Sequence, residues 1–442
     1  MLMDRKRKLI AVCMMIGIVA GLAGCGNAGQ EAEIQMEAGQ ELTVYTVEGI
    51  EFYDQAVTAF QGKYKEMAIN YVTFETEEDL ARQYSNDVAM GTQPDVLLLT
   101  DETTIDVFKA CKNYRFANLT PYFESDEAFY DVVYFEEALK AGCYEDKQYI
   151  VPFRMEIPYY LITNRVTDVI DVEALRKANG QEQMQLLMNA ADTVKEQGIM
   201  EGGVFCAQLS MEEIIRTSGI SLCGLQDEEL ELQKEQVRLL CDYTKYVVED
   251  TKIQAKKRET STDMLTLLST AGIEQCYDNP FYAGRVYDMM FEYAYGTDLE
   301  WILAKAVDDA DSYHADITKY GMVDAQSDNV RGAYQLLRYL MDYKTRMDFS
   351  TEIYVHRSNT TTEFVNMSEV TSLGAGARVS AMGYSKYLRV ENMLNSLTDI
   401  SIPNHKVEEI YLAVTADYLN GNRTFDDMYM ELENRFTIYW KE

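Results

Sequence analysis

The side chains best suited to ligand chemistry lie in the stretch from Tyr149 to Arg165. Here Phe153, Arg154 and Glu156 bring an aromatic ring, a fixed cation and a carboxylate close together in the chain. An aromatic face covers apolar ligand surface, while a guanidinium and a carboxylate hydrogen-bond polar groups. This combination is typical of the wall of a ligand cleft.

Two prolines shape the same stretch. Pro152 and Pro158 push the residues before them out of the helical region, which predicts two short extended runs on either side of a kink. We interpret the stretch as an extended connection that leaves one α/β body and enters a second, as a hinge does. A plain edge hairpin is the alternative that the residues leave open.

A second set of polar residues follows two predicted strands. Thr46, Glu48 and Gly49 lie at the end of the first strand, and Thr100, Asp101 and Glu102 follow the third. Parallel α/β sheets place their ligands at the carboxyl ends of the strands. The alternative is that these residues are helix caps and turn formers.

The elements that must position these residues begin with alternating strands and helices. Strands are predicted at Glu41–Val47, Ile69–Phe74 and Asp95–Leu99. Apolar residues at helical spacing from Tyr53 to Tyr64 and from Leu80 to Val88 predict the two helices between them. This order favours an α/β fold with a mostly parallel sheet.

The remaining chain reads as mainly helical from Val172 to Glu259. A strand end is expected at Tyr320–Val323, and Ser327-Asp328-Asn329 caps a helix that reaches Met341. Further predicted features are an apolar helix at Met264–Ala271, a break at Phe281–Val286, an aromatic cluster from Phe291 to Trp301, and helices from Val407 to Leu419 and through Met428 to Tyr439.

The sequence lacks the motifs of several classes of catalytic and metal-binding site. The three histidines show no metal-ligand spacing, and no zinc-protease, serine-hydrolase or phosphate-loop motif is present. Asp308–Asp311 lacks the glycine and terminal glutamate of a calcium loop. We therefore expect no catalytic residues, no metal and no cofactor. Carboxylates are abundant enough to leave a glycosidase pair open as an alternative.

The N-terminal residues predict export. Arg5–Lys8 precede an apolar run, Leu9–Leu22, that is short for a membrane span. The sequence Leu22-Ala23-Gly24-Cys25 resembles the lipobox of bacterial lipoproteins, which implies a signal peptide at 1–24 and a diacylglyceryl group on Cys25. Residues 25–40 then form a flexible tether. An ordinary signal peptide with a chance cysteine is the alternative.

The net charge of the chain after the signal peptide disfavours one class of partner. Removing residues 1–24, with four basic residues and one acidic residue, leaves 36 basic and 72 acidic residues and a formal net charge of −36. Such a surface repels nucleic acid.

Six cysteines remain after Cys25, and we expect mostly buried free thiols, with one disulfide as the alternative. They are Cys111, Cys143, Cys206, Cys223, Cys241 and Cys276.

Several segments together, in this order, resemble the extracellular solute-binding proteins of ABC transporters, closest to the sugar-type family. The matching segments are the lipobox, Gly91–Val96, Asn118–Tyr122, Pro152–Asn164, Phe281–Arg285, Ser327–Met341, Tyr418–Gly421 and Glu433–Arg435. No single segment is specific, whereas the ordered set spans nearly the whole chain after Cys25. The sequence departs from the family pattern at Val286–Met289.

The resemblance implies a two-lobed, periplasmic-binding-protein-like fold of type II with the ligand cleft between its lobes. One lobe would comprise residues 41–151 and 312–350, and the other residues 152–311 and 351–442. Carried over by position, the resemblance nominates seven ligand-binding residues. They are Glu48, Thr92, Asp101, Arg154, Tyr159, Trp301 and Arg357.

The function that the resemblance implies is solute capture without catalysis. We expect a monomer anchored to the extracellular face of the cell membrane, which binds a sugar or oligosaccharide and delivers it to the permease subunits of an ABC importer. The alternatives are a surface polysaccharide hydrolase, and a peptide-binding, adhesin or sensor protein on the same fold. A peptide ligand would need a carboxylate clamp, for which Arg154 or Arg357 is available.

Overall fold

The structure is a computed structural model that describes residues 41–200, 203–205, 210–227, 233–255, 272–278, 300–344, 352–357, 392 and 394–441. These residues belong to one compact unit, Glu37–Glu442. The features expected at 1–40, 264–271, 281–286 and 291–299 lie outside the described residues. Within the described ranges, no helix has both the length and the apolar character needed to cross a bilayer.

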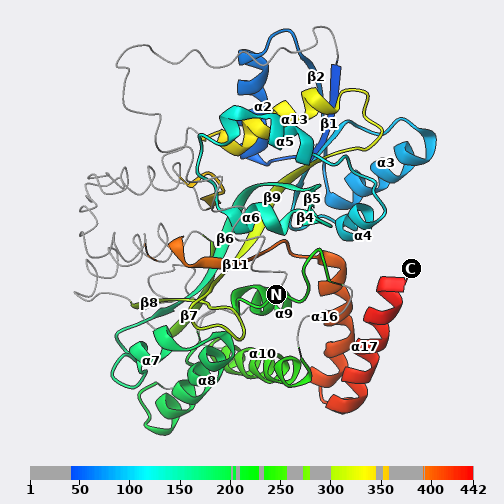
Figure 1. Ribbon diagram of the computed structural model, residues 1–442. Helices are drawn as coiled ribbons and strands as arrows, with labels where there is room; N and C mark the ends of the chain where they lie inside the picture. Colours follow the sequence, from blue (N-terminus) through cyan, green and yellow to red (C-terminus); the bar gives the residue numbers. More distant parts are fainter. Residues whose placement is uncertain are drawn as a thin grey trace, which may run out of the picture. The chain divides into compact units, whose positions relative to one another are not determined.

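The first described elements are a βαβαβ unit. Strands β1 (Glu41–Val47), β2 (Ala68–Phe74) and β3 (Val96–Thr100) are separated by helices α2 (Glu51–Lys63) and α3 (Glu77–Met90). β1 pairs in parallel with both β2 and β3. Every residue of β3 is buried, as expected for a strand covered on both faces. The predicted order of these elements is confirmed (Figure 1).

Local signals set the ends of α3. The Thr76 side chain accepts a hydrogen bond from the backbone N–H of Asp79 at the start of the helix. Gly91 ends it with φ 73°, a left-handed conformation that glycine adopts without steric cost. α3 thus stops before β3, where the Gly91–Pro94 sequence predicted.

The sheet as a whole is mixed. It has nine strands in the described part of the chain, with the order β10-β6-β9-β3-β1-β2; β11 lies beside β9, and β7 and β8 lie beside β6. β9 is antiparallel to both β3 and β6. The expectation of a mostly parallel sheet is therefore wrong: in the described part of the chain, parallel pairing joins β1 to β2 and β3 and joins β11 to β9, and the other pairs of the large sheet are antiparallel. The added strands are β6 (Val151–Ile162), β7 (Ile273–Asp278), β8 (Glu300–Leu303), β9 (Tyr313–Val323), β10 (Ile353–Tyr354) and β11 (Leu397–Ser401).

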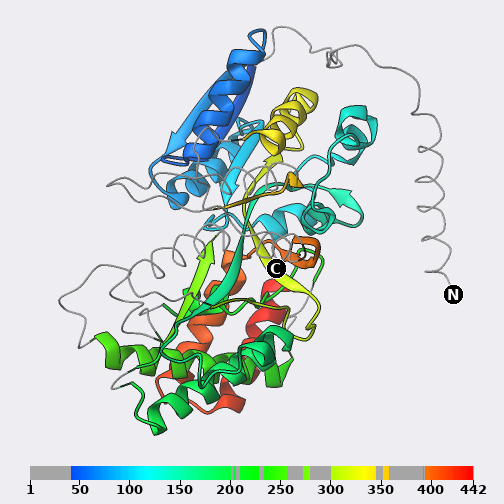
Figure 2. The same ribbon diagram turned by 90° about the vertical axis from the view of Figure 1, so that its left-hand side faces the viewer.

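The two long strands, β6 and β9, change partners along their length (Figures 1 and 2). β6 pairs with β9 up to Glu156, and from Ile157 onward it pairs with β7 and β8. β9 pairs with β11 up to Asp316, then with β6, and its last residues also pair with β3. Glu156 and Asp316 are register partners, so both strands change neighbours at the same place.

The proposed kink in Tyr149–Arg165 is wrong, because one continuous strand, β6, runs through it. The register against β9 shifts between Pro152 and Arg154 and again between Arg154 and Met155. A bulge of this kind accommodates proline, which has no N–H to donate to the ladder.

Helices make up most of the remaining structure, which confirms the prediction that the described part of 172–259 is mainly helical. Asn329 caps α13 by accepting from the backbone N–H of Gly332. The further helices are α4 (Val107–Lys112), α5 (Thr120–Ser125), α6 (Glu136–Ala141), α7 (Val172–Lys177), α8 (Gly180–Glu196), α9 (Met211–Thr217), α10 (Lys234–Ala255), α13 (Val330–Asp342), α16 (His405–Leu419) and α17 (Phe425–Lys441). A 3₁₀ turn (Glu127–Phe129) and the hairpin of β4 (Cys143–Tyr144) and β5 (Lys147–Gln148) complete the fold.

None of the five cysteines that the structure describes is in a disulfide bond. Cys111, Cys223 and Cys241 are buried, and Cys143 and Cys276 are partly exposed. Cys206 lies outside the described residues. The expectation of free thiols is confirmed for these five residues, and burial raises the pKa of the Cys143 thiol to about 11.

Arg154 ties four elements together from the middle of the bulge in β6. Its side chain is 1% exposed, and its guanidinium carbon lies 3.9 Å from the ring centre of Phe52 in α2 and 3.7 Å from that of Tyr354 in β10. Its Nη1 and Nη2 donate to the backbone oxygens of Phe153 and Tyr343, at 3.1 Å each. A buried cation held by two rings and two carbonyls is a structural centre of the first part of the sheet.

Replacing Arg154 with Met should therefore destabilise the fold. The loss of the two ring contacts and of the hydrogen bonds to two carbonyls should lower the free energy of unfolding by about 2–4 kcal/mol. Urea unfolding monitored by circular dichroism measures this change. The control is Arg82→Met, because the Arg82 side chain is 69% exposed and pairs with Asp79 of the same helix. The control should cost less than about 1 kcal/mol; equal costs for both variants would contradict a structural role for Arg154.

Candidate functional site

The carboxyl ends of β1 and β3 lie at the same edge of the sheet, since the two strands are parallel neighbours. At the end of β3, the Thr100 hydroxyl donates to Glu77 Oε1 in the first turn of α3, at 2.8 Å. The backbone N–H of Glu102 donates to the Thr100 hydroxyl, at 3.3 Å. Burial raises the pKa of Glu77. Thr100 thus forms the turn and holds Glu77 at this edge.

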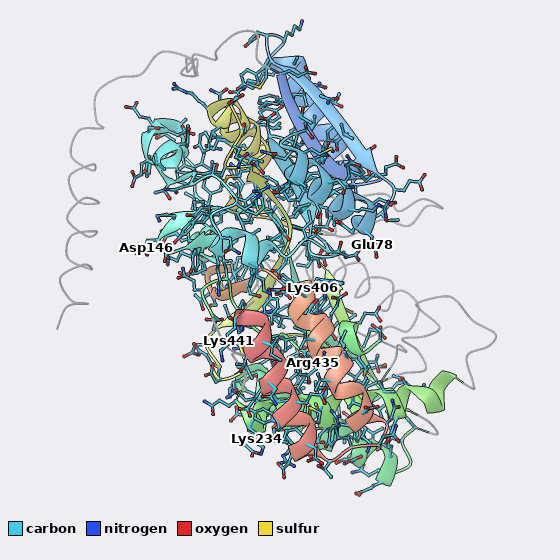
Figure 3. The ribbon with its side chains drawn as sticks, turned by 90° about the vertical axis from the view of Figure 1, so that its right-hand side faces the viewer. Glu78, Asp146, Lys234, Lys406, Arg435 and Lys441 are labelled. Atoms are coloured by element: carbon cyan, nitrogen blue, oxygen red, sulfur yellow. The ribbon has the colours of Figure 1, made fainter. Side chains whose placement is uncertain are left out.

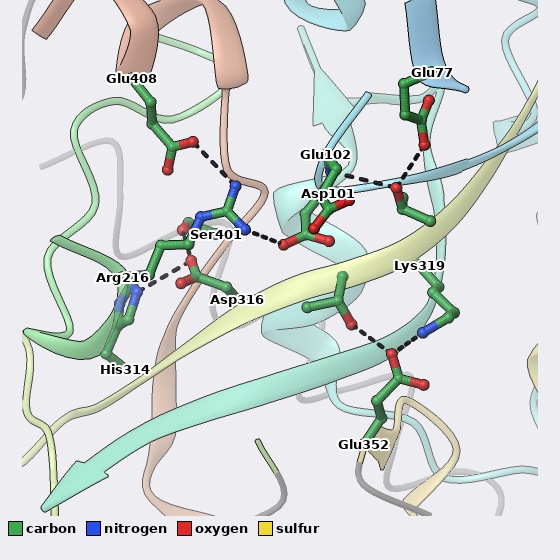
Figure 4. Close-up of polar contacts among 12 residues, drawn as sticks. Glu77, Asp101, Glu102, Arg216, His314, Asp316, Lys319, Glu352, Ser401 and Glu408 are labelled. Atoms are coloured by element: carbon green, nitrogen blue, oxygen red, sulfur yellow. Dashed lines mark hydrogen bonds and ion pairs between the residues drawn. The ribbon is translucent and has the colours of Figure 1, made fainter. Parts of the chain in front are cut away.

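Asp101 joins β3 to two distant helices (Figure 4). Its Oδ2 accepts from Nη1 of Arg216 in α9 at 2.7 Å, and Nη2 of Arg216 donates to Glu408 Oε2 in α16 at 3.1 Å. The side chains of all three are largely buried, with exposed fractions of 8–12%. Arg216 therefore bridges two carboxylates from different elements, in surroundings where each charge depends on its partner.

The position of Arg216 follows from how α9 begins and ends. A capping box between Ser210 and Glu213 fixes the first turn of α9. Gly219, with φ 70°, follows the helix, and a Cβ there would lie 2.7 Å from Cβ of Ala304. The Thr217 hydroxyl donates to Gln275 Oε1 of β7 at 2.9 Å. These constraints hold Arg216, in the last turn of α9, against the end of β3.

A buried histidine lies next to this group, where β9 meets β11. Nδ1 of His314 lies 2.7 Å from Asp399 Oδ2, and its Nε2 lies 3.1 Å from Asp316 Oδ1. Burial by itself would lower the pKa of His314, but the charges of Asp316 and Asp399 outweigh it and raise this pKa well above its usual value. Both ring nitrogens face a carboxylate oxygen, an arrangement that favours the imidazolium form. The Ser401 hydroxyl also donates to Asp316, at 2.8 Å.

A small pocket opens beside Arg216. It is lined by Arg216, Asp316, Ser401, Asn404 and Glu408, together with Pro403, Val407 and residues 220–223. Its volume of ≈ 20 Å³ gives room for about one water molecule and not for a sugar ring. Four of the lining residues, Arg216, Asp316, Ser401 and Glu408, make the hydrogen bonds described above. The pocket therefore adjoins the Arg216 cluster, which we define as Asp101, Arg216, His314, Asp316, Asp399 and Glu408.

Of the seven nominated ligand contacts, Asp101 is the one that lies in the Arg216 cluster. Glu48 is exposed at the end of β1, where the Thr73 hydroxyl lies 3.4 Å from its Oε1. Thr92 is exposed after α3, and its hydroxyl donates to Asp87 Oδ1 at 3.2 Å.

The other four nominated residues lie on the long sheet or next to it. Arg154 and Tyr159 are buried in β6, and Trp301 in β8 is the register partner of Leu161, two residues beyond Tyr159. Arg357 is partly exposed, with its guanidinium carbon 5.5 Å from the ring centre of Phe135. Their roles as solute contacts stay predictions; the surroundings of Arg154 are those of a core residue.

Sequence reasoning missed most of the Arg216 cluster. Arg216 and Glu408 lie within helical patterns, where a single charged residue gives no sign of its tertiary partners. One signal was present in the strand: His314, Asp316 and Thr318 alternate along β9, which predicts a polar face. Among the described residues, no group of three or more His, Cys, Asp or Glu side chains is arranged to hold a metal ion.

Comparisons with known proteins give matches among solved structures. No protein-family model matches the sequence, and no curated protein matches it. The extracellular solute-binding protein family 1 member from Alicyclobacillus acidocaldarius aligns over 92% of this chain and 100% of its own, with 13% identity and a TM-score of 0.54. The sugar-binding protein MalE from Xanthomonas citri aligns over 91% and 98%, with 10% identity and a TM-score of 0.56.

A third similar structure is the galacto-N-biose-/lacto-N-biose I-binding protein of an ABC transporter from Bifidobacterium longum, solved with lacto-N-biose. It aligns over 90% of this chain and 96% of its own, with 12% identity and a TM-score of 0.57. At these identities the comparisons establish the fold. The chain has the two-lobed, periplasmic-binding-protein-like α/β fold found in the extracellular solute-binding proteins of ABC transporters.

Proposed function

We propose that this protein is an extracellular solute-binding protein, anchored to the cell membrane by a lipid, that captures a sugar or oligosaccharide and delivers it to an ABC importer. The observation that carries the proposal is the extent of the structural match, which covers 90–92% of this chain and 96–100% of three solute-binding proteins. A match of this extent includes both lobes of those proteins, and therefore all of the fold that encloses a solute.

The division into lobes at 41–151 with 312–350 and at 152–311 with 351–442 is part of this proposal. It is supported by β6 and β9, which exchange their neighbours where Glu156 faces Asp316. One adjustment follows from the contacts of residues 352–357 with the first lobe: the Phe135 N–H donates to Val355 O at 3.1 Å, and the Arg357 N–H donates to Val133 O at 2.9 Å. We place residues 352–357 with the first lobe for this reason.

The proposed solute contacts are those nominated from the sequence, and the structure supports them unequally. Glu48 is exposed at the carboxyl end of β1, where α/β sheets place their ligands. Tyr159 and Trp301 lie on neighbouring strands, but both are buried, so the structure gives their proposed contact with a sugar less support than that of Glu48. Asp101 already accepts a hydrogen bond from Arg216, so a solute that reached it would share or displace that contact.

A panel of solutes tests the function directly. A neutral oligosaccharide that binds the folded protein and not the unfolded chain should stabilise it by about 2.7 kcal/mol at 100 times its dissociation constant. Thermal unfolding of the purified protein with mono-, di- and oligosaccharides, peptides and amino acids measures the shift, and calorimetry then gives the affinity. A shift with peptides and none with any sugar would contradict the sugar assignment. Release of new reducing ends from the bound saccharide would contradict a non-enzymatic role.

The lipid anchor has its own test. Cys25→Ser removes the thiol that would carry the diacylglyceryl group, so the protein should move from the membrane fraction to the medium or the soluble fraction. Mass spectrometry of the wild-type mature protein should show an acylated N-terminal Cys25. The matched control is Cys13→Ser, which alters a cysteine inside the apolar run and should leave the protein in the membrane fraction. An unmodified Cys25 in the wild-type protein would remove the anchor from the proposal.

A further inference from the structure

The turn and short helix after β3, residues 101–112, contact three helices from distant parts of the sequence. At one end of this segment, Asp101 pairs with Arg216 of α9, which also binds Glu408 of α16 (Figure 4). α16 and α17 lie side by side, as Figure 3 shows. We call the surface between residues 101–112 and α9, α16 and α17 the 101–112 interface.

The other end of the 101–112 interface is held by a hydrogen bond and two cation–π contacts. The Tyr439 hydroxyl of α17 donates to Asp106 Oδ1 at 2.9 Å. Nζ of Lys109 lies 4.4 Å from the ring centre of Tyr439, and Nζ of Lys112 lies 4.1 Å from a ring centre of Trp440. These cation–π contacts provide attraction that does not depend on the titration of a carboxylate.

The end of the interface at Arg216 has more carboxylates than cations. The Arg216 cluster contains four carboxylates, those of Asp101, Asp316, Asp399 and Glu408, against one guanidinium and one imidazolium. His314 lies between Asp316 and Asp399, and Arg216 lies between Asp101 and Glu408 and also attracts Asp316. Burying more carboxylates than cations in one cluster costs free energy, because the negative charges are only partly balanced within it. Binding a proton removes that cost.

Asp101 is the member of the cluster placed to take up this proton. Its neighbours with charge or a titrating group come from each element packed on it: Arg216 from α9, Glu408 from α16, Lys319 and Tyr320 from β9, and Glu102 from its own turn. Lys319 forms an ion pair with Glu352, so its charge is shared. Glu102 is exposed to solvent and adds a further negative charge.

We propose that the 101–112 interface is proton-linked: packing Asp101 against Arg216 takes up one proton from solvent onto the Asp101 carboxylate, so that acidic conditions strengthen the interface. Under the proposed division into lobes, residues 101–112 belong to the first lobe and α9, α16 and α17 to the second. The inference rests on that division, and it makes the spacing of the two lobes dependent on pH.

The direction of the effect follows from the two states of Asp101. Burial, the largest cause, outweighs the attraction of Arg216 and raises the pKa of Asp101 from 3.8 to about 7. When the lobes separate, water reaches the carboxyl and its pKa returns toward the ordinary value. The packed form therefore holds more protons between these two values, and lowering the pH in this range favours it. The ratio of packed to separated molecules should rise about tenfold from pH 8 to pH 6.

Solution scattering between pH 8 and pH 5.5, without any solute, measures this ratio. The wild-type protein should compact as the pH falls, and the quenching of Trp440 fluorescence by acrylamide should fall in parallel, because Trp440 lies at the interface. Asp101→Asn imitates the protonated carboxyl. It should remain in the compact form at pH 8, with little change down to pH 6.

A matched control distinguishes the effect of protonating Asp101 from the effect of losing a contact at the interface. Lys112→Met removes the cation next to Trp440 and should loosen the interface at every pH while keeping the tenfold pH dependence. A wild-type protein whose dimensions do not change with pH would overturn the proposal, as would a full pH response in Asp101→Asn. Circular dichroism of each variant confirms that it is folded. Since no solute is present, failure of the solute-binding proposal would leave these readouts unchanged.

Discussion

The structure depends on the ladder between β6 and β9. The first half of β6 pairs with the middle of β9, and beyond that region each strand pairs with strands that the other does not contact. Backbone hydrogen bonds across a buried ladder must all be satisfied, so the ladder resists separation. The chain on either side of Glu156 and Asp316 is connected through these two strands, and movement there requires small changes of backbone angle at a few residues.

Charged side chains gather where the strands change partners because the sheet is interrupted there. Asp316 lies at the changeover, and His314, Arg216 and Asp101 surround it. An apolar core at this place would hold the elements together without selecting one arrangement. Burying paired charges has a high desolvation cost, and the attraction between them depends on the geometry of their hydrogen bonds. Such pairs are therefore favourable only when all partners are in position. The Arg216 cluster thus makes the local arrangement specific, whereas the aromatic contacts of α17 contribute attraction.

The sequence predicted the fold best where local pattern decides structure. The strands and helices from Glu41 to Thr100 were identified because alternation, helical spacing and the Gly91–Pro94 stop act within a few residues. Only the end of β9 was identified, since His314, Asp316 and Lys319 interrupt its apolar pattern. The kink in β6 was predicted from its prolines, and the ladder with β9 overrode it. Arg216 gave no signal, because its two carboxylate partners lie 115 and 192 residues away in the sequence.

The polar groups at the carboxyl end of β3 already bind side chains of α3 and α9. Thr100 holds Glu77, and Asp101 holds Arg216, each at 2.8 Å or less. A solute that enters here exchanges these hydrogen bonds for its own, so the net gain from each new contact is small compared with its strength in isolation. Affinity then has to come from groups that are already oriented and from apolar surface that the solute covers. A site with an excess of negative charge also repels anionic solutes. Neutral hydroxyl-rich molecules avoid this repulsion and have a smaller desolvation cost than ions on entering the site.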